Sequence, residues 1–171
     1  MLDRLIDFII DILGLFQFWV VIDHYEQGVV LRFGKYNRTL DPGIHPMWPF
    51  SIEEALTESV VPTTKNLGPQ SLTTFDDVAV VVSGVITYRI HDIKKVLLEV
   101  EDAETCLEDS SYGVIGEAVN HENWDALIDA EFHEGLSKAI RKRAWRWGIE
   151  VQQVQLAEVA KCWSVRLWND G

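Results

Sequence analysis

The sequence has few cysteines and few positive charges. Its two cysteines, Cys106 and Cys162, lie far apart, outside any CxxC pattern and with no histidine at metal-ligand spacing. This spacing argues against a disulfide framework and against a zinc site, so no metal or cofactor is predicted. With 15 Lys and Arg against 27 Asp and Glu, the formal net charge is -12. Because binding to a phosphate backbone depends on cations, nucleic acid is a poor candidate partner.

Catalytic motifs are also absent. The sequence contains no GxSxG elbow, no GxxxxGK[ST] loop and no GxGxxG turn. Its five histidines form neither HExxH nor another close ligand pair, so each is better explained as a surface or structural residue. The sequence therefore predicts a protein that is not an enzyme.

Strands are expected in the first half of the chain. A β-favouring run, FQFWVVI, begins at Phe16, and two strands with a tight connection are expected within residues 24–50. The Asp-Pro-Gly sequence at residues 41–43 is typical of a turn. The strongest strand is expected over residues 78–88, where apolar side chains alternate with a period of two.

Helices are expected in the second half. Residues 92–122 predict a short helix and then a longer one, with Asp102 as a candidate N-cap. A third helix is expected from residue 129 to Gly148, and a closing strand over residues 149–159. Strands followed by helices and one closing strand indicate an α+β fold.

The charges of the second half are separated by sign. Residues 96–137 contain no Lys or Arg, whereas a basic group follows directly within the third expected helix. An acidic helix and a basic helix end suit head-to-tail contact between copies of the chain. The alternatives are a solvated acidic face and cations that complement the helix dipole. The residues predicted to mediate self-association are Glu101, Asp102, Glu104, Glu108, Lys138, Arg141, Lys142, Arg143 and Arg146.

Residues 26–50 carry a dense family motif. The sequence EQGVVLRFGKYNRTLDPGIHPMWPF resembles the opening of the SPFH domain, also called band 7, which stomatins, prohibitins, flotillins and bacterial membrane-protease regulators share. The resemblance continues through LTTFDDVAVVVSGVITYRI and WGIEVQQVQLAEV and covers residues 20–159. It implies an α+β SPFH fold with antiparallel strands, no catalytic residues, and a membrane-attached scaffold. The chain resembles a short form, because the coiled coil usual after the last strand is absent from its 171 residues.

The first 22 residues are apolar but carry Asp3, Asp7 and Asp11 at intervals of four. On a helix these acids share one narrow stripe, which indicates an amphipathic membrane helix to about Leu15. The longest acid-free run is residues 12–22, shorter than the roughly 20 residues of a membrane span. A helix in the membrane plane, a tilted span with its acids facing protein, and a helix packed on its own domain all stay open.

The loop MWPF at residues 47–50 is unusually apolar for a surface loop. In members of the resembled family the equivalent loop faces the bilayer, whereas the alternative is that it tucks between two subdomains. The residues predicted to contact the membrane are Leu2, Leu5, Ile6, Ile9, Ile12, Leu13, Phe16, Met47, Trp48 and Phe50.

Four segments are expected: a membrane-anchoring segment (1–19), a first SPFH subdomain (20–68), a second one (69–160) and a tail (161–171). The expected function is a non-enzymatic scaffold at a cell or inner membrane, which self-assembles as a ring or cage and organises a membrane microdomain. The alternative is a regulatory module that binds a membrane protease or another membrane protein without large self-assembly. Membrane lipid and further copies of the chain are the expected partners.

Overall fold

The computed structural model describes residues 18–50 and 52–162. The expected amphipathic helix, and the seven predicted membrane contacts from Leu2 to Phe16, lie outside these residues. The described fold forms two compact units. The first unit holds the described residues up to Val61 together with Ile90–Glu101, and the second holds Pro62–Arg89 and the described residues from Asp102 onward.

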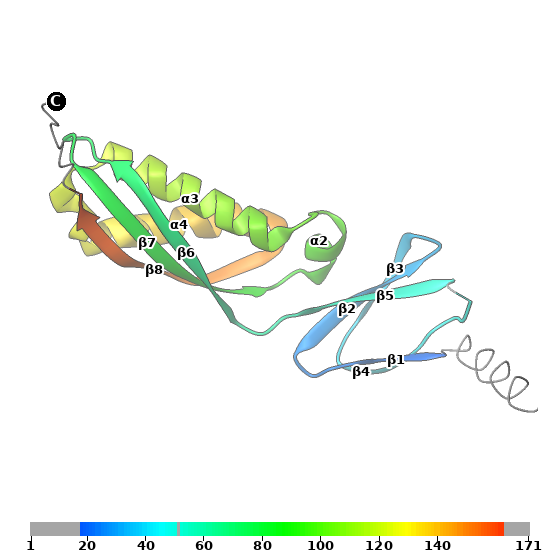
Figure 1. Cartoon of the computed structure of the whole chain (residues 1–171). Coiled ribbons are helices and arrows are strands. Elements are labelled where there is room, and N and C mark those ends of the chain that lie inside the picture. The colour runs from blue at the N-terminus through cyan, green and yellow to red at the C-terminus, as the bar shows by residue number, and fades with distance from the viewer. Residues whose placement is uncertain (1–17, 51, 163–171) are drawn as a thin grey trace, which may run out of the picture. The chain divides into compact units, whose positions relative to one another are not determined.

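The first unit is built from two small sheets and one short helix (Figure 1). Strands β1 (Trp19–Ile22) and β4 (Gly43–Pro46) pair antiparallel. Strand β2 (Glu26–Arg32) lies between β3 (Lys35–Leu40) and β5 (Glu53–Ser59), antiparallel to both. Helix α2 (Ile93–Leu98) contacts β2 and β5.

Strand β2 is central because both of its faces are covered. Val29 and Val30 are fully buried although neighbouring strand residues point to opposite faces. Val30 belongs to a small core with Ile22 and Leu40, against which Val20, Met47 and Ala55 pack. A Cβ at Gly28 would lie 2.6 Å from the backbone oxygen of Leu56, so the close approach of β5 requires glycine at this position.

The turn between β2 and β3 has two residues with positive φ, Phe33 at 51° and Gly34 at 74°. Two such residues form a type I′ turn, whose twist matches that of the flanking strands. The hairpin fixes the register that places Arg32 opposite Lys35 on β3, and the pairing of β2 with β5 places Arg32 opposite Glu53.

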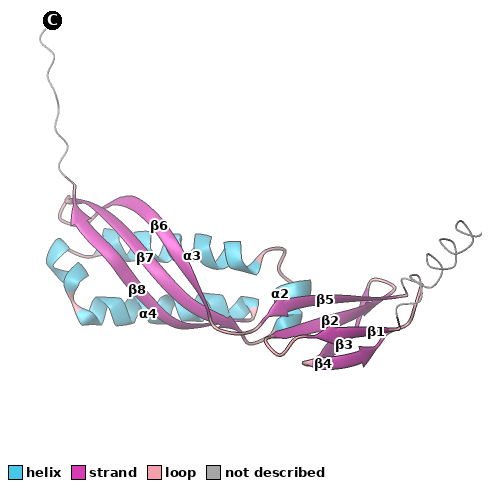
Figure 2. Ribbon diagram, turned by 60° about the horizontal axis from the view of Figure 1, so that its bottom comes forward, coloured by secondary structure: helices cyan, strands magenta, loops and turns pink. Residues whose placement is uncertain are grey.

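The second unit is a three-stranded sheet covered by helices on one face, as Figures 1 and 2 show from two directions. Its strands, in the order β6-β7-β8, are β6 (Thr63–Thr73), β7 (Ala79–Ile90) and β8 (Ile149–Lys161). Arg89 pairs with Glu150 at one end of β7 and β8, and the Cys162 N–H donates to the Ala79 carbonyl at the other. These two strands therefore run antiparallel.

Helix α3 (Ala103–His121) contacts β6, and helix α4 (Ala130–Ala144) contacts β8. The 3₁₀ helix η1 (Trp124–Ile128) joins them, and a second one, η2 (Trp145–Trp147), leads from α4 to Gly148. Gly148 has a φ of 82°, a left-handed conformation that suits glycine at a helix end. Buried apolar residues from both helices close the core against the sheet, among them Leu107, Ile115 and Ile140.

Several sequence predictions are confirmed by these elements. The strand expected over residues 78–88 is β7, in which residues 80, 82, 84, 86 and 88 are buried. The short helix, the longer helix, the third helix and the closing strand correspond to α2, α3, α4 and β8. Asp102 is the N-cap of α3, and its side chain accepts a hydrogen bond from the Thr105 N–H.

Two expectations differ from the structure. Residues 24–50 form three strands rather than two, because residues after the Pro42–Gly43 turn return to pair with β1. The boundary expected between residues 68 and 69 falls inside the continuous strand β6, and the chain instead divides at Val61. Residues 90–101 also return to the first unit, a crossing that local sequence patterns do not reveal.

Candidate functional site

The loop after β4 exposes two aromatic side chains. Trp48 is 59% exposed and Phe50 is 61% exposed, and Phe50 has a positive φ of 62°. Met47 differs from its neighbours, since it is half-buried and packs against the core of Ile22, Val30 and Leu40. Of the three loop residues predicted to contact a membrane, two therefore point outward from the first unit and one points into it.

The β1-β4 pair adds apolar residues that the sequence analysis did not select. Val21 lies opposite Ile44 in the antiparallel register, and Trp19 lies two residues before Val21 on the same face of β1. These three side chains are 60%, 74% and 61% exposed, in the order named, whereas the alternate residue Ile22 is buried. The alternation within WVVI was the available signal. We call Trp19, Val21, Ile44, Trp48 and Phe50 the apolar surface of the first unit.

An open groove of about 670 Å³ lies beside the loop. Its single charged lining residue is Arg38, and the remaining side chains are apolar. The Phe18 carbonyl accepts a hydrogen bond of 2.7 Å from the Met47 N–H, which holds the start of the described chain against the loop. The groove is lined by Phe18, Arg38, Pro46, Met47, Trp48, Pro49, Phe50 and Ile52.

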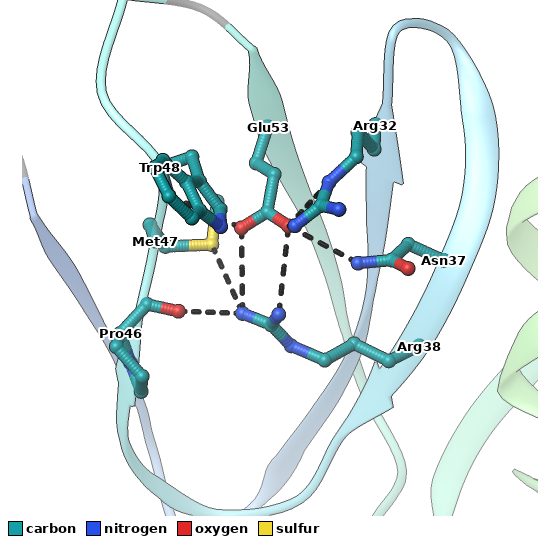
Figure 3. Close-up of polar contacts among 7 residues, drawn as sticks. All are labelled: Arg32, Asn37, Arg38, Pro46, Met47, Trp48 and Glu53. Atoms are coloured by element: carbon teal, nitrogen blue, oxygen red, sulfur yellow. Dashed lines mark hydrogen bonds and ion pairs between the residues drawn. The ribbon is translucent and has the colours of Figure 1, made fainter.

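A buried carboxylate holds this loop in place (Figure 3). The side chain of Glu53 is fully buried, and its Oε2 accepts a hydrogen bond of 3.2 Å from the Trp48 N–H. Its Oε1 accepts 2.9 Å and 3.2 Å hydrogen bonds from the guanidinium of Arg32 and a 3.1 Å bond from Asn37. Arg38 reaches both carboxylate oxygens at 3.5 Å.

The two arginines also contact the loop directly. Arg38 donates to the carbonyl of Pro46 and lies 3.9 Å from the sulfur of Met47. The guanidinium of Arg32 lies over the ring of Trp48, 5.9 Å from its centroid. Glu53, Arg32 and Arg38 therefore connect three strands to the loop, and we call them the Glu53 cluster.

The Glu53 cluster favours an ionised carboxylate. Burial by itself would raise the pKa of Glu53, but the hydrogen bonds from the Trp48 N–H and from Arg32, together with the charges of Arg38 and Arg32, outweigh it. The net result is a pKa below the usual value of about 4.5. Sequence reasoning missed this cluster, because Arg32, Arg38 and Glu53 meet only once β2, β3 and β5 pair.

Three of the four acidic residues predicted for self-association have partners within the second unit. Lys65 on β6 bridges Glu104 at 2.8 Å and Glu108 at 3.4 Å. Asp102 caps α3, and its bonds to Thr105 hold the pKa of its carboxyl below the ordinary value. Glu101 is exposed and belongs to the first unit. Of these four acids, the structure thus brings Glu104 and Glu108 together, because both bind Lys65.

The basic residues divide into two groups. The Arg141 guanidinium donates to the carbonyls of Val151 and Gln152 on β8, and Arg143 pairs with Glu117 on α3 at 3.0 Å. Within residues 18–50 and 52–162, the other three cations, Lys138, Lys142 and Arg146, are exposed and form no ion pair.

The described residues contain no group of three or more His, Cys, Asp or Glu side chains placed to hold a metal ion. No helix in the described part of the chain is both long enough and apolar enough to cross a bilayer.

Comparison with known proteins gives relatives from archaea, bacteria and mammals. The chain is 25% identical to an uncharacterized protein of Methanocaldococcus jannaschii, over 82% of this chain and 71% of that protein. It is 32% identical to protein HflK of Vibrio cholerae, over 66% of this chain and 28% of HflK. It is 24% identical to the mitochondrial stomatin-like protein 2 of Rattus norvegicus, over 81% of this chain and 40% of that protein.

The model of one protein family, described as SPFH domain / Band 7 family, matches residues 20–161. This range begins within β1 and ends with the last residue of β8, so it contains the loop, the Glu53 cluster and every described helix and strand of the second unit. The chain therefore belongs to the SPFH domain / Band 7 family.

Proposed function

We propose that this protein is a non-enzymatic, membrane-associated scaffold that self-assembles on a bilayer through its SPFH domain and organises a membrane microdomain. The observation that carries the proposal is the apolar surface of the first unit, above all Trp48 and Phe50. Large apolar side chains exposed in this number on one small unit are a feature of protein or membrane interaction sites. Trp48 also suits the interface between lipid tails and headgroups, where tryptophan is enriched.

The Glu53 cluster explains how the loop can present these side chains. Hydrogen bonds at Trp48, Pro46 and Met47 fix the loop backbone before any contact with lipid. A preordered loop loses less conformational entropy on binding than a flexible one. The predicted apolar contacts between Leu2 and Phe16 would act beside it as the anchoring segment, since several weak attachments on one surface reinforce each other.

The net charge of the chain indicates which kind of interaction would hold it on a membrane. A formal net charge of -12 gives no general attraction to anionic lipid. Binding then depends on burial of apolar area, which salt does not screen. Salt screens only the repulsion between the acidic chain and anionic lipid, so we expect vesicle binding not to weaken when salt is raised from low to physiological concentration.

A second candidate function is a regulatory module that binds a membrane protease or another membrane protein without large self-assembly. One observation favours it: Glu104, Glu108, Arg141 and Arg143 are already engaged by partners within their own unit. Fewer charged residues are then left for contact between copies. The two candidates differ in the mass of the particle that mild detergent extracts from the membrane.

Vesicle flotation of the full chain tests the membrane half of the proposal. Replacing Trp48→Ser and Phe50→Ser together should weaken partition into phosphatidylethanolamine–phosphatidylglycerol vesicles about tenfold or more, because burial of two aromatic side chains is lost. The matched control replaces Phe75→Ser and Ile128→Ser, two exposed apolar residues of the second unit, and should leave partition unchanged. Equal partition of both variants and the parent chain would refute a membrane role for the loop.

A further inference from the structure

The second unit has a surface hollow to which the proposed function so far assigns no role. The hollow, of about 340 Å³, lies where the end of α3, η1 and the start of α4 meet. Its floor is apolar, with Phe132 and Leu136, and its rim carries Glu122, Asp129 and Glu131. Within the described residues these three acids form no ion pair, and Asp129 makes no side-chain capping bond at the start of α4. A basic side chain with an apolar stem fits this combination of rim and floor.

The second half of α4 and η2 carry the complementary feature. Lys138, Lys142 and Arg146 follow each other at intervals of four residues, so they form one stripe along the helix and into η2. All three are exposed, and none forms an ion pair among the described residues. Trp145, which is 54% exposed, lies next to Arg146 and adds apolar area at the same end.

A single copy cannot join these two features. Fifteen residues separate Glu131 from Arg146, which corresponds to about 22 Å along a helix. Helix α4 packs on β8, and a helix cannot fold its basic end back onto its own first turn. The basic end of the stripe, at Lys142 and Arg146, therefore cannot reach the hollow of its own copy.

We propose that the hollow of one copy receives the stripe of Lys138, Lys142 and Arg146 from a second copy, in a head-to-tail contact. The inference rests on the proposed function, of which it names the assembling surface. It also replaces the acidic partner predicted from the sequence, because Lys65 already binds Glu104 and Glu108. The contact is heterologous, so it forms a ring if the rotation between copies closes and a filament if it does not. The dipoles of successive α4 helices would align head to tail, which favours the same arrangement.

Charge reversal with complementation tests this contact in the full chain on vesicles and after mild detergent extraction. One variant carries Lys138→Glu, Lys142→Glu and Arg146→Glu, and a second carries Glu122→Lys and Glu131→Lys. Asp129 is left intact to keep the start of α4, and Arg141 and Arg143 keep their partners on β8 and α3. The control carries Asp109→Lys and Glu158→Lys, two exposed acids of the second unit outside the hollow.

Each reversed variant alone should raise the dissociation constant of self-association about tenfold or more, because like charges then face each other across the contact. An equimolar mixture of the two variants should assemble again, because the reversed stripe of one variant meets the reversed hollow of the other, and the native stripe meets the native hollow. The control should assemble as the parent chain does. Restored assembly in the mixture excludes misfolding as the cause of the losses.

The outcomes separate this inference from the proposed function. If the parent chain assembles and both reversed variants assemble equally well, the contact is wrong while the scaffold stands. If both variants fail and the mixture also fails, the contact is likewise refuted, because complementary charges do not restore it. If the parent chain itself stays monomeric on vesicles, the proposed self-assembly is refuted, whatever the variants do.

Discussion

At the scale of single residues, Glu53 connects the fold of the first unit to its exposed loop. One buried carboxylate meets Arg32, Asn37 and Arg38 from two strands and the Trp48 N–H from the loop. Such a group is retained in an apolar setting only when its oxygens are fully paired. The geometry of the loop therefore depends on the charge of one residue.

Replacing Glu53→Gln should lower the free energy of unfolding of the first unit by about 1–3 kcal/mol, because one acceptor oxygen becomes an NH2 donor and the two arginines lose their counter-charge. Urea unfolding followed by tryptophan fluorescence measures the change. Glu54→Gln is the matched control, since Glu54 is exposed on the same strand and should change stability by less than about 0.5 kcal/mol. Equal effects of the two substitutions would contradict the role given to the cluster.

The pKa of Glu53 predicts a dependence on pH. Its pKa in the folded chain is lower than in the unfolded chain, so its ionisation stabilises the fold fully above the usual value of about 4.5. As the pH falls through the lowered folded pKa, the carboxylate is protonated and this contribution is lost. Unfolding measured as a function of pH should show a loss of stability below pH 4.5 that is smaller in Glu53→Gln. An identical pH profile for parent and variant would refute the assignment.

Residues of the site differ in how well the sequence predicts them. Trp48 and Phe50 were identified because an apolar loop after a Pro-Gly turn is visible within a few letters. Glu53 and Arg38 were not, since they are 15 positions apart in sequence and meet only through strand pairing. The inward direction of Met47 could not be predicted from its sequence neighbours, because it depends on the core that Met47 contacts.

At the scale of elements, β2 depends on the close approach of its neighbours. Gly28→Ala would place a Cβ 2.6 Å from the Leu56 oxygen, and the backbone of β5 would have to shift. We expect a loss of about 1–3 kcal/mol in the unfolding free energy of the first unit, as for other overpacked sites.

Gly135→Ala is the matched control for this prediction. Gly135 lies within α4, and a Cβ there meets no atom within 4 Å. The same chemical change should therefore stabilise the second unit by about 0.5–1 kcal/mol, because alanine favours a helix. Thermal unfolding of both variants measures these changes. If both variants lose stability by similar amounts, the close approach of β5 is not the reason that Gly28 is required.

Elements with a strong period were predicted well, and pairing between distant strands was not. Alternation identified β7, and spacing of three and four identified α4. The pairing of β1 with β4 escaped prediction because four-residue strands carry too short a period. The face formed by Trp19, Val21 and Ile44 was missed for the same reason.

At the scale of the whole molecule, the family and the α+β class could be predicted from the sequence, but the division into units could not. Residues 90–101 leave the second unit and pack on the first, so the chain crosses between them more than once. A family can be identified from sequence because many short motifs agree with one another. The passage of the chain from one unit to the other depends instead on contacts between residues far apart in sequence.

The central claim is that the protein assembles on membranes. The most direct test is the mass of full-length particles extracted from membranes with mild detergent, compared with the 19.6 kDa of one chain. We expect membrane-bound material that yields particles of one size, each containing many copies. A chain recovered from the soluble fraction without detergent, with the mass of a monomer, would contradict it.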